Sequence, residues 1–73
     1  MIDRIKNTIA PILELNVLDI SDDFSQSLCG KWDSLNHLNI IVALEDEFDV
    51  SFEPEEIALM SSVISISNIL KKK

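Results

Sequence analysis

A chain of 73 residues has room for one domain, and at this length a single core buries only about 60% of the surface that the unfolded chain exposes. An enzyme-sized substrate cleft would use core that so short a chain needs, so the length favours a binding, carrier or interaction module over a catalyst. Thirteen acidic residues against six basic ones give a net charge of −7, which argues against nucleic acid as a partner and favours a protein with a basic surface.

The cysteine content and the absence of a leader predict the compartment. Cys29 is the only cysteine, so it cannot form an internal disulfide, and neither a signal peptide nor a long apolar span is visible. We therefore expect a cytoplasmic protein without a membrane span, in which Cys29 is a small apolar loop residue. No metal site is predicted, because no Cys or His cluster has ligand spacing and the acid-rich segment after residue 44 lacks the glycine of a calcium-binding loop.

Apolar residues near the N-terminus occur at helical spacing and predict an amphipathic helix of about four turns. They are Ile2, Ile5, Ile9, Ile12 and Leu13. Pro11 lies within this pattern and lacks a backbone N–H, so we expect a kink between Asn7 and Pro11 or a helix that restarts there. The periodicity then lapses from Asn16 to Asp33, which predicts a long connection. Its apolar residues are expected to anchor it to the core: Val17, Leu18, Ile20, Phe24 and Leu28.

Three further helices are predicted. The second should run from Ser34 to Asp49 with Asp33 as its N-cap, because a carboxylate there accepts the free N–H groups of the first turn. A short third helix should begin at Glu53–Pro54 and end near Met60, and Ser61 or Ser62 should cap a final helix that ends in the terminal lysines. The sequence therefore predicts one all-α domain over residues 1–73, with four helices, a short third helix and a long first loop.

The second helix presents two apolar faces. Its core stripe is predicted to contain His37, Ile41, Leu44 and Phe48, with Ile40 beside it. The opposite line contains Leu35, Asn39, Val42 and Asp46, and it is flanked by Glu45 and Asp49. An apolar strip edged with acid suits a partner that has basic residues around an apolar groove. The alternative is that Leu35 and Val42 are isolated apolar residues of an ordinary surface.

Ser34 begins this helix directly after a loop and should therefore be exposed. A nucleophilic serine needs a general base within hydrogen-bonding reach, and His37 lies three residues further on. However, no Gly-x-Ser-x-Gly turn surrounds Ser34, and His37 is expected at the upper edge of the core. We therefore predict neither a Ser34–His37 dyad nor an enzyme.

The chain resembles the acyl carrier proteins and the related peptidyl and D-alanyl carrier domains. The resemblance depends on Asp33-Ser34-Leu35 at the start of a helix that ends in ALEDEF, followed by Phe52, Glu55-Glu56 and Val63, and it covers mainly the C-terminal half. It implies an acyl-carrier-type four-helix bundle. It also implies that Ser34, flanked by Asp33 and Leu35, carries a covalent 4′-phosphopantetheine arm whose thiol holds acyl or aminoacyl groups as thioesters.

The resemblance further implies the partners. They are a phosphopantetheinyl transferase, an acyl- or aminoacyl-activating ligase and a downstream transferase or synthase, all acting on a monomeric carrier. The docking residues would be Leu35, Asn39, Val42, Glu45 and Asp46. The alternative from another class is an unmodified acidic helical module that binds a partner through the strip from Leu35 to Val42.

Two departures from the family pattern bear on the pathway. Carriers of fatty-acid synthesis usually have acids soon after the serine, whereas this chain has Asn36, His37 and Asn39. Lys31 and Trp32 also lengthen the loop before Asp33. The resemblance therefore implies a specialised carrier, in secondary metabolism, polysaccharide modification or an aminoacyl pathway. Trp32 has two open interpretations: it shields the arm or contacts a partner, or it packs on the core.

Overall fold

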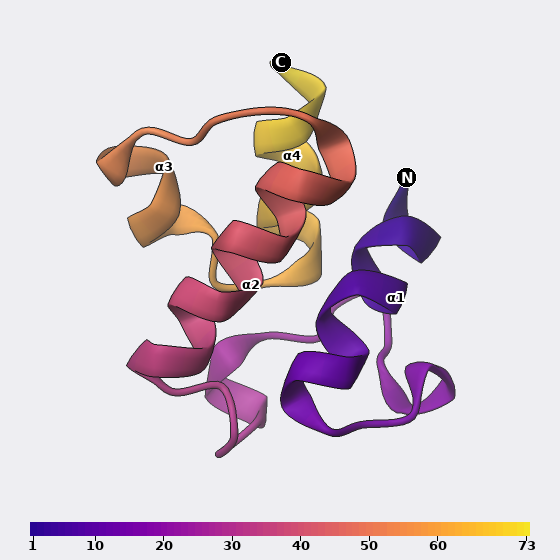
Figure 1. Ribbon diagram of the computed structural model, residues 1–73. Coiled ribbons are helices and arrows are strands. Elements are labelled where there is room, and N and C mark those ends of the chain that lie inside the picture. The colour runs from indigo at the N-terminus through magenta and orange to yellow at the C-terminus, as the bar shows by residue number, and fades with distance from the viewer.

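The computed structural model describes all 73 residues and confirms the all-α architecture with a short third helix and a long first connection. The helices are α1 (Ile2–Leu13), α2 (Ser34–Phe48), α3 (Pro54–Leu59) and α4 (Val63–Lys71), and two 3₁₀ turns, η1 (Val17–Asp19) and η2 (Gln26–Leu28), lie between α1 and α2. In Figure 1, α2 crosses the front of the molecule with α1 on one side and α3 on the other, and α4 lies behind it. No helix is both long and apolar enough to cross a bilayer.

Helix α1 packs its apolar face into the core. Ile5, Ile9 and Leu13 recur every fourth residue and are completely buried. One helix runs through Pro11 and does not restart there, and Pro11 itself is exposed, so its ring and missing N–H lie away from the core. The helix ends at Leu13, and its C-cap Glu14 has a left-handed φ of 57°.

The long connection is fastened to the entry of α4. The Gln26 N–H donates to the Ser61 carbonyl at 2.7 Å, and the Val63 N–H donates to the Phe24 carbonyl at 3.0 Å. Because Phe24 is also buried, the second half of the connection is held by both backbone bonds and apolar packing. Cys29 is half-buried against the core as a free thiol.

The predicted anchors of this connection are only partly correct. Ile20 is buried and Val17 is half-buried against the core, but Leu18 and Leu28 are 88% and 69% exposed, so the prediction was wrong for these two leucines. Leu18 and Leu28 belong to the 3₁₀ turns η1 and η2. A turn of three residues points consecutive side chains in different directions, so only part of each turn can face the core.

Helix α2 begins and ends close to the predicted residues. The Asp33 carboxylate accepts the Asn36 N–H at 2.8 Å, which confirms the N-cap. Ile40, Ile41 and Leu44 are buried. The helix ends at Phe48, one residue before the prediction, because Asp49 adopts a left-handed φ of 54° and forms the C-cap. No basic residue lies in the last turn.

Phe48 occupies the edge of the core and not its interior. It is half-buried, and the Arg4 guanidinium lies 4.4 Å from the centre of its ring. Arg4 also pairs with the Glu47 carboxylate at 3.0 Å, so α1 and the end of α2 are joined by an ion pair and a cation–π contact. The expected core position of Phe48 is therefore only half correct.

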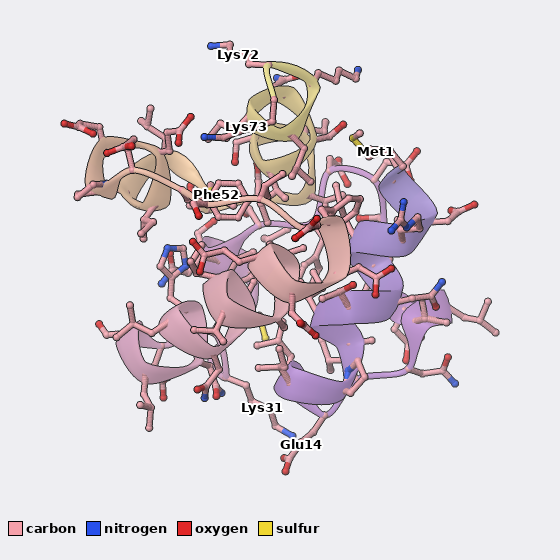
Figure 2. All side chains as sticks on the ribbon, turned by 45° about the horizontal axis from the view of Figure 1, so that its top comes forward. Met1, Glu14, Lys31, Phe52, Lys72 and Lys73 are labelled. Carbon is pink, nitrogen blue, oxygen red and sulfur yellow. The ribbon has the colours of Figure 1, made fainter.

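Helices α3 and α4 are capped as their sequences predict. Glu53 and Glu56 form a reciprocal capping box at α3, and Ser62 caps α4. At the C-terminus, the Lys73 ammonium donates to the Glu56 carboxylate at 2.7 Å and lies 5.5 Å from the Phe52 ring (Figure 2). The N–H of Glu53 and the Lys73 ammonium both favour the ionised carboxylate and lower the pKa of Glu56 below its ordinary value.

Candidate functional site

Ser34 is the first residue of α2, and it is exposed as predicted. Hydrogen bonds surround it without using its hydroxyl: Asp33 accepts from the Asn36 backbone, and the Asn36 amide donates to the Lys31 carbonyl at 2.7 Å. The Gln26 amide donates to the Trp32 carbonyl at 2.9 Å and fixes the preceding segment. These hydrogen bonds therefore hold the chain around Ser34, and none of them engages its hydroxyl.

His37 cannot serve Ser34 as a general base. Its Nδ1 accepts the indole N–H of Trp32 at 2.9 Å, and its Nε2 lies 2.8 Å from the carbonyl oxygen of Ile57. Since both ring nitrogens are occupied by other groups, the geometry contains no Ser34–His37 dyad.

Trp32 packs on the core, which decides between its two interpretations. Only 2% of the residue is exposed, and its ring stacks between Phe24 and His37, with both pairs of ring centres 6.1 Å apart. A side chain buried to this degree has no free surface with which to cover an arm or touch a partner.

The outer face of α2 carries the predicted strip and one residue that the sequence reasoning missed. Leu35 and Val42 are 69% and 65% exposed, and Asn39 and Asp46 are also exposed. Leu38 was not assigned to this face, yet it is 55% exposed. It follows Leu35 by three residues, and side chains at that spacing lie on neighbouring positions of one helix face, so the spacing could have identified it.

Glu45 has a structural contact that the sequence did not indicate. Its carboxylate accepts the backbone N–H of Phe52 at 2.9 Å, and the residue is half-buried. Four residues advance a helix by only about 40°, so Glu45 lies close to the buried Ile41 and at the boundary between the two faces. The side chain therefore holds the α2–α3 connection as well as bordering the outer face.

Comparison with known proteins identifies the family. Residues 3–70 match the model of the phosphopantetheine attachment site family. The chain is also 33% identical over 69 residues to the acyl carrier protein of Clostridium acetobutylicum, an alignment that covers 94% of this chain and 90% of that protein. The chain belongs to the acyl carrier protein family. This acyl carrier protein is therefore a carrier and not an enzyme, and it holds acyl groups on a covalent 4′-phosphopantetheine arm for partner enzymes.

The start of α2 suits such an arm. A phosphodiester is an anion, and the N-terminus of a helix carries partial positive charge and free N–H groups. Asp33 is the one acid beside Ser34, and its carboxylate already accepts a bond from the helix backbone. Lys31, the nearest lysine or arginine in the sequence, pairs with Glu14 at 3.1 Å at the lower edge of Figure 2. The match to the phosphopantetheine attachment site family also favours a carrier with a covalent arm over the alternative of an unmodified interaction module.

Proposed function

We propose that Ser34 is the residue that carries the 4′-phosphopantetheine arm and that this carrier presents acyl or aminoacyl thioesters to successive enzymes. The observation that carries the proposal is the exposed and unbonded Ser34 hydroxyl at the start of a capped helix. When attached, the arm supplies a thiol that forms thioesters. Its length and flexibility raise the concentration of cargo at a partner's active site.

The chain itself would play a passive part in its modification. The Ser34 oxygen forms the new phosphodiester bond while the bond from phosphorus to the adenosine bisphosphate half of coenzyme A breaks. Because His37 has no free nitrogen, the base that removes the hydroxyl proton belongs to the transferase. Asp33 fixes the start of the helix, and Leu35 offers an exposed apolar contact beside the reacting oxygen.

The docking surface in this proposal comprises Leu35, Asn39, Val42, Glu45 and Asp46. Its partners are a phosphopantetheinyl transferase, an acyl- or aminoacyl-activating ligase and a downstream transferase or synthase. Exposed leucine and valine side chains next to acids support binding to an apolar groove edged with basic residues. The proposal places a monomeric, single-domain carrier in the cytoplasm, in a specialised pathway, because Asn36, His37 and Asn39 leave the region after Ser34 uncharged.

Mass spectrometry after incubation with coenzyme A and a broad-specificity transferase tests the attachment. The wild-type chain should gain the mass of one phosphopantetheine group, and Ser34→Ala should gain nothing. Ser51→Ala is the matched control, because Ser51 is also an exposed serine next to a helix and should not affect loading. A mass gain that persists in Ser34→Ala, or a wild-type chain that stays unmodified with several transferases, would refute the proposal.

Transferase kinetics test the docking surface. Val42→Ala should lower kcat/KM about fivefold, because truncating a modest apolar contact costs roughly 1 kcal/mol and each 1.4 kcal/mol is tenfold in affinity. Ile64→Ala is the control, since Ile64 is an exposed apolar residue of α4 and lies outside the proposed surface. Equal losses in the two variants would show that the outer face of α2 has no special role.

A further inference from the structure

Three groups from separate parts of the chain form a hydrogen-bonded bridge next to Ser34. The indole N–H of Trp32 donates to His37 Nδ1 at 2.9 Å, and His37 Nε2 lies 2.8 Å from the Ile57 carbonyl oxygen. The Trp32 and His37 rings also stack, with an angle of 27° between their planes. This Trp32–His37–Ile57 bridge joins the segment before Ser34, the first turn of α2, and α3.

The partners of His37 allow one tautomer. An indole nitrogen can only donate a hydrogen bond, so Nδ1 of His37 must be the acceptor. The imidazole proton is then on Nε2, which donates to the Ile57 carbonyl. Every polar atom of the bridge is thus satisfied, and no buried side-chain nitrogen or oxygen in the protein lacks a partner.

The bridge lies between α2 and α3, close to the proposed attachment site at Ser34. His37 follows Ser34 by three residues, about one helical turn, and its bond to Ile57 ties α2 to α3 at that level. Ile40 and Leu44 of α2 and Met60, the C-cap of α3, have no exposed surface, so the core beside the bridge is filled. The two hollows in the surface lie against α1, and neither is lined by a residue of α3 or of the first turn of α2.

Entry of an alkyl chain between α2 and α3 would be costly here. The chain would have to break the part-buried bond between His37 and Ile57, and the carbonyl and the imidazole N–H would both lose their partner. It would also have to displace side chains that are fully buried. A short or polar acyl group gains too little from burial to offset such costs, because the gain rises only with each buried methylene group.

We infer that the Trp32–His37–Ile57 bridge keeps the cargo outside the helical core, and that this carrier serves short or polar acyl groups in preference to long alkyl chains. The inference rests on the proposed attachment at Ser34. A short or polar acyl group loses little by remaining in water, and it stays available to a partner enzyme without any opening of the helices. His37 and Trp32 are therefore specificity-determining residues that act by closing a space.

The test loads the wild-type protein with arms of increasing length. A transferase would attach phosphopantetheine carrying acetyl, hexanoyl or decanoyl groups through a stable amide, and the mass spectrum would confirm each product. Two properties are then measured: the melting temperature and the indole N–H resonance of Trp32, which is the only tryptophan and gives a single signal. Burial of cargo in the folded state would raise the melting temperature and shift this resonance.

The expected result is that the acetyl, hexanoyl and decanoyl forms share one melting temperature and one indole N–H position. A melting temperature that rises with chain length, together with a shift of the indole signal, would overturn the inference. A protein that gains no mass at Ser34 would instead refute the proposed function, and this inference with it. The mass spectrum separates these two failures before any melting curve is recorded.

A variant that removes the bridge gives a second comparison. His37→Ala deletes both hydrogen bonds and leaves space between α2 and α3. A decanoyl group can then be buried there, so the decanoyl form of this variant should melt above its acetyl form. Asn68→Ala is the matched control, because Asn68 is also a polar residue of a helix, α4, but is exposed and lies outside the proposed docking surface. Its melting temperature should not depend on chain length. Length-dependent melting in both variants would contradict the role of His37. The wild-type comparison stands whether or not His37→Ala folds.

Discussion

Replacing Glu45 by lysine should destabilise the fold, although Glu45 borders the proposed docking surface. Its carboxylate accepts the Phe52 N–H at 2.9 Å and so holds the α2–α3 connection. A hydrogen bond to a charged group contributes about 1.5–3 kcal/mol, and a lysine would leave the Phe52 N–H without an acceptor. A domain of this length has an unfolding free energy of roughly 4–11 kcal/mol, so the loss is a large fraction of the total.

The assay is thermal unfolding followed by circular dichroism. For a domain of this size each kcal/mol shifts the melting temperature by about 4–8 °C, so Glu45→Lys should melt about 6–24 °C below the wild type. Asp46→Lys makes the same change of charge at the next residue, which is exposed and has no hydrogen bond to lose. It should shift the melting temperature by less than about 4 °C, as surface substitutions do. Glu45→Gln keeps an acceptor oxygen and should fall between the two.

The two lysine variants should also differ in what they do to loading. Asp46→Lys should slow modification most at low salt, because exposed charges are screened over about 8–10 Å at physiological ionic strength. If Glu45→Lys and Asp46→Lys have the same melting temperature, the bond to Phe52 contributes nothing to stability. The assignment of a structural role to Glu45 would then be wrong.

Three further changes test other parts of the fold. Asp33→Ala removes the N-cap acceptor of α2 and should cost about 1 kcal/mol in urea unfolding; no loss would show that the cap is dispensable. Phe48→Ala should cost less than the roughly 2–5 kcal/mol expected for Leu44→Ala, because Leu44 is fully buried and Phe48 is not, and equal costs would contradict this. The pKa of Glu56 is lowered in the folded state. As the pH falls below the ordinary pKa of 4.5, Glu56 is therefore protonated in the unfolded chain before it is protonated in the folded protein. Glu56→Gln should therefore melt below the wild type at neutral pH, and the difference should vanish as pH falls through the lowered pKa; a constant difference would contradict the linkage.

The helices were predictable because their signals are local. Apolar residues at every third or fourth position placed α1 and α2, and residue type identified Asp33 as a cap and narrowed the cap of α4 to Ser61 or Ser62, of which the structure uses Ser62. The exposure of Ser34 was predicted from its place directly after a loop, although Val63, the first residue of α4, is buried. The face of α2 that carries Leu35 and Val42 needed only the helical repeat.

The remaining features depend on contacts between distant parts of the chain. Leu18 and Leu28 have the same apolar character as Ile20, and only the path of the loop decides which of them reaches the core. His37 and Ile57 are 20 residues apart, so no local pattern predicts their hydrogen bond. The contact of Glu45 with the backbone of Phe52 is likewise not visible in the sequence, because any residue type except proline could donate that backbone N–H.

The left-handed end of α2 has an energetic consequence for the proposed docking surface. Asp46 lies in the last turn of the helix and Asp49 forms its C-cap, where the helix carries partial negative charge and lysine or arginine would be more stable. Neither aspartate forms an ion pair, and Asp49 adopts a backbone conformation that glycine would accept more easily. These two residues oppose the stability of the helix that they end. Residues that destabilise their own helix are expected at functional sites. The left-handed backbone of Asp49 and the unfavourable charge of Asp46 at the negative end of α2 therefore support the proposal that partners bind here.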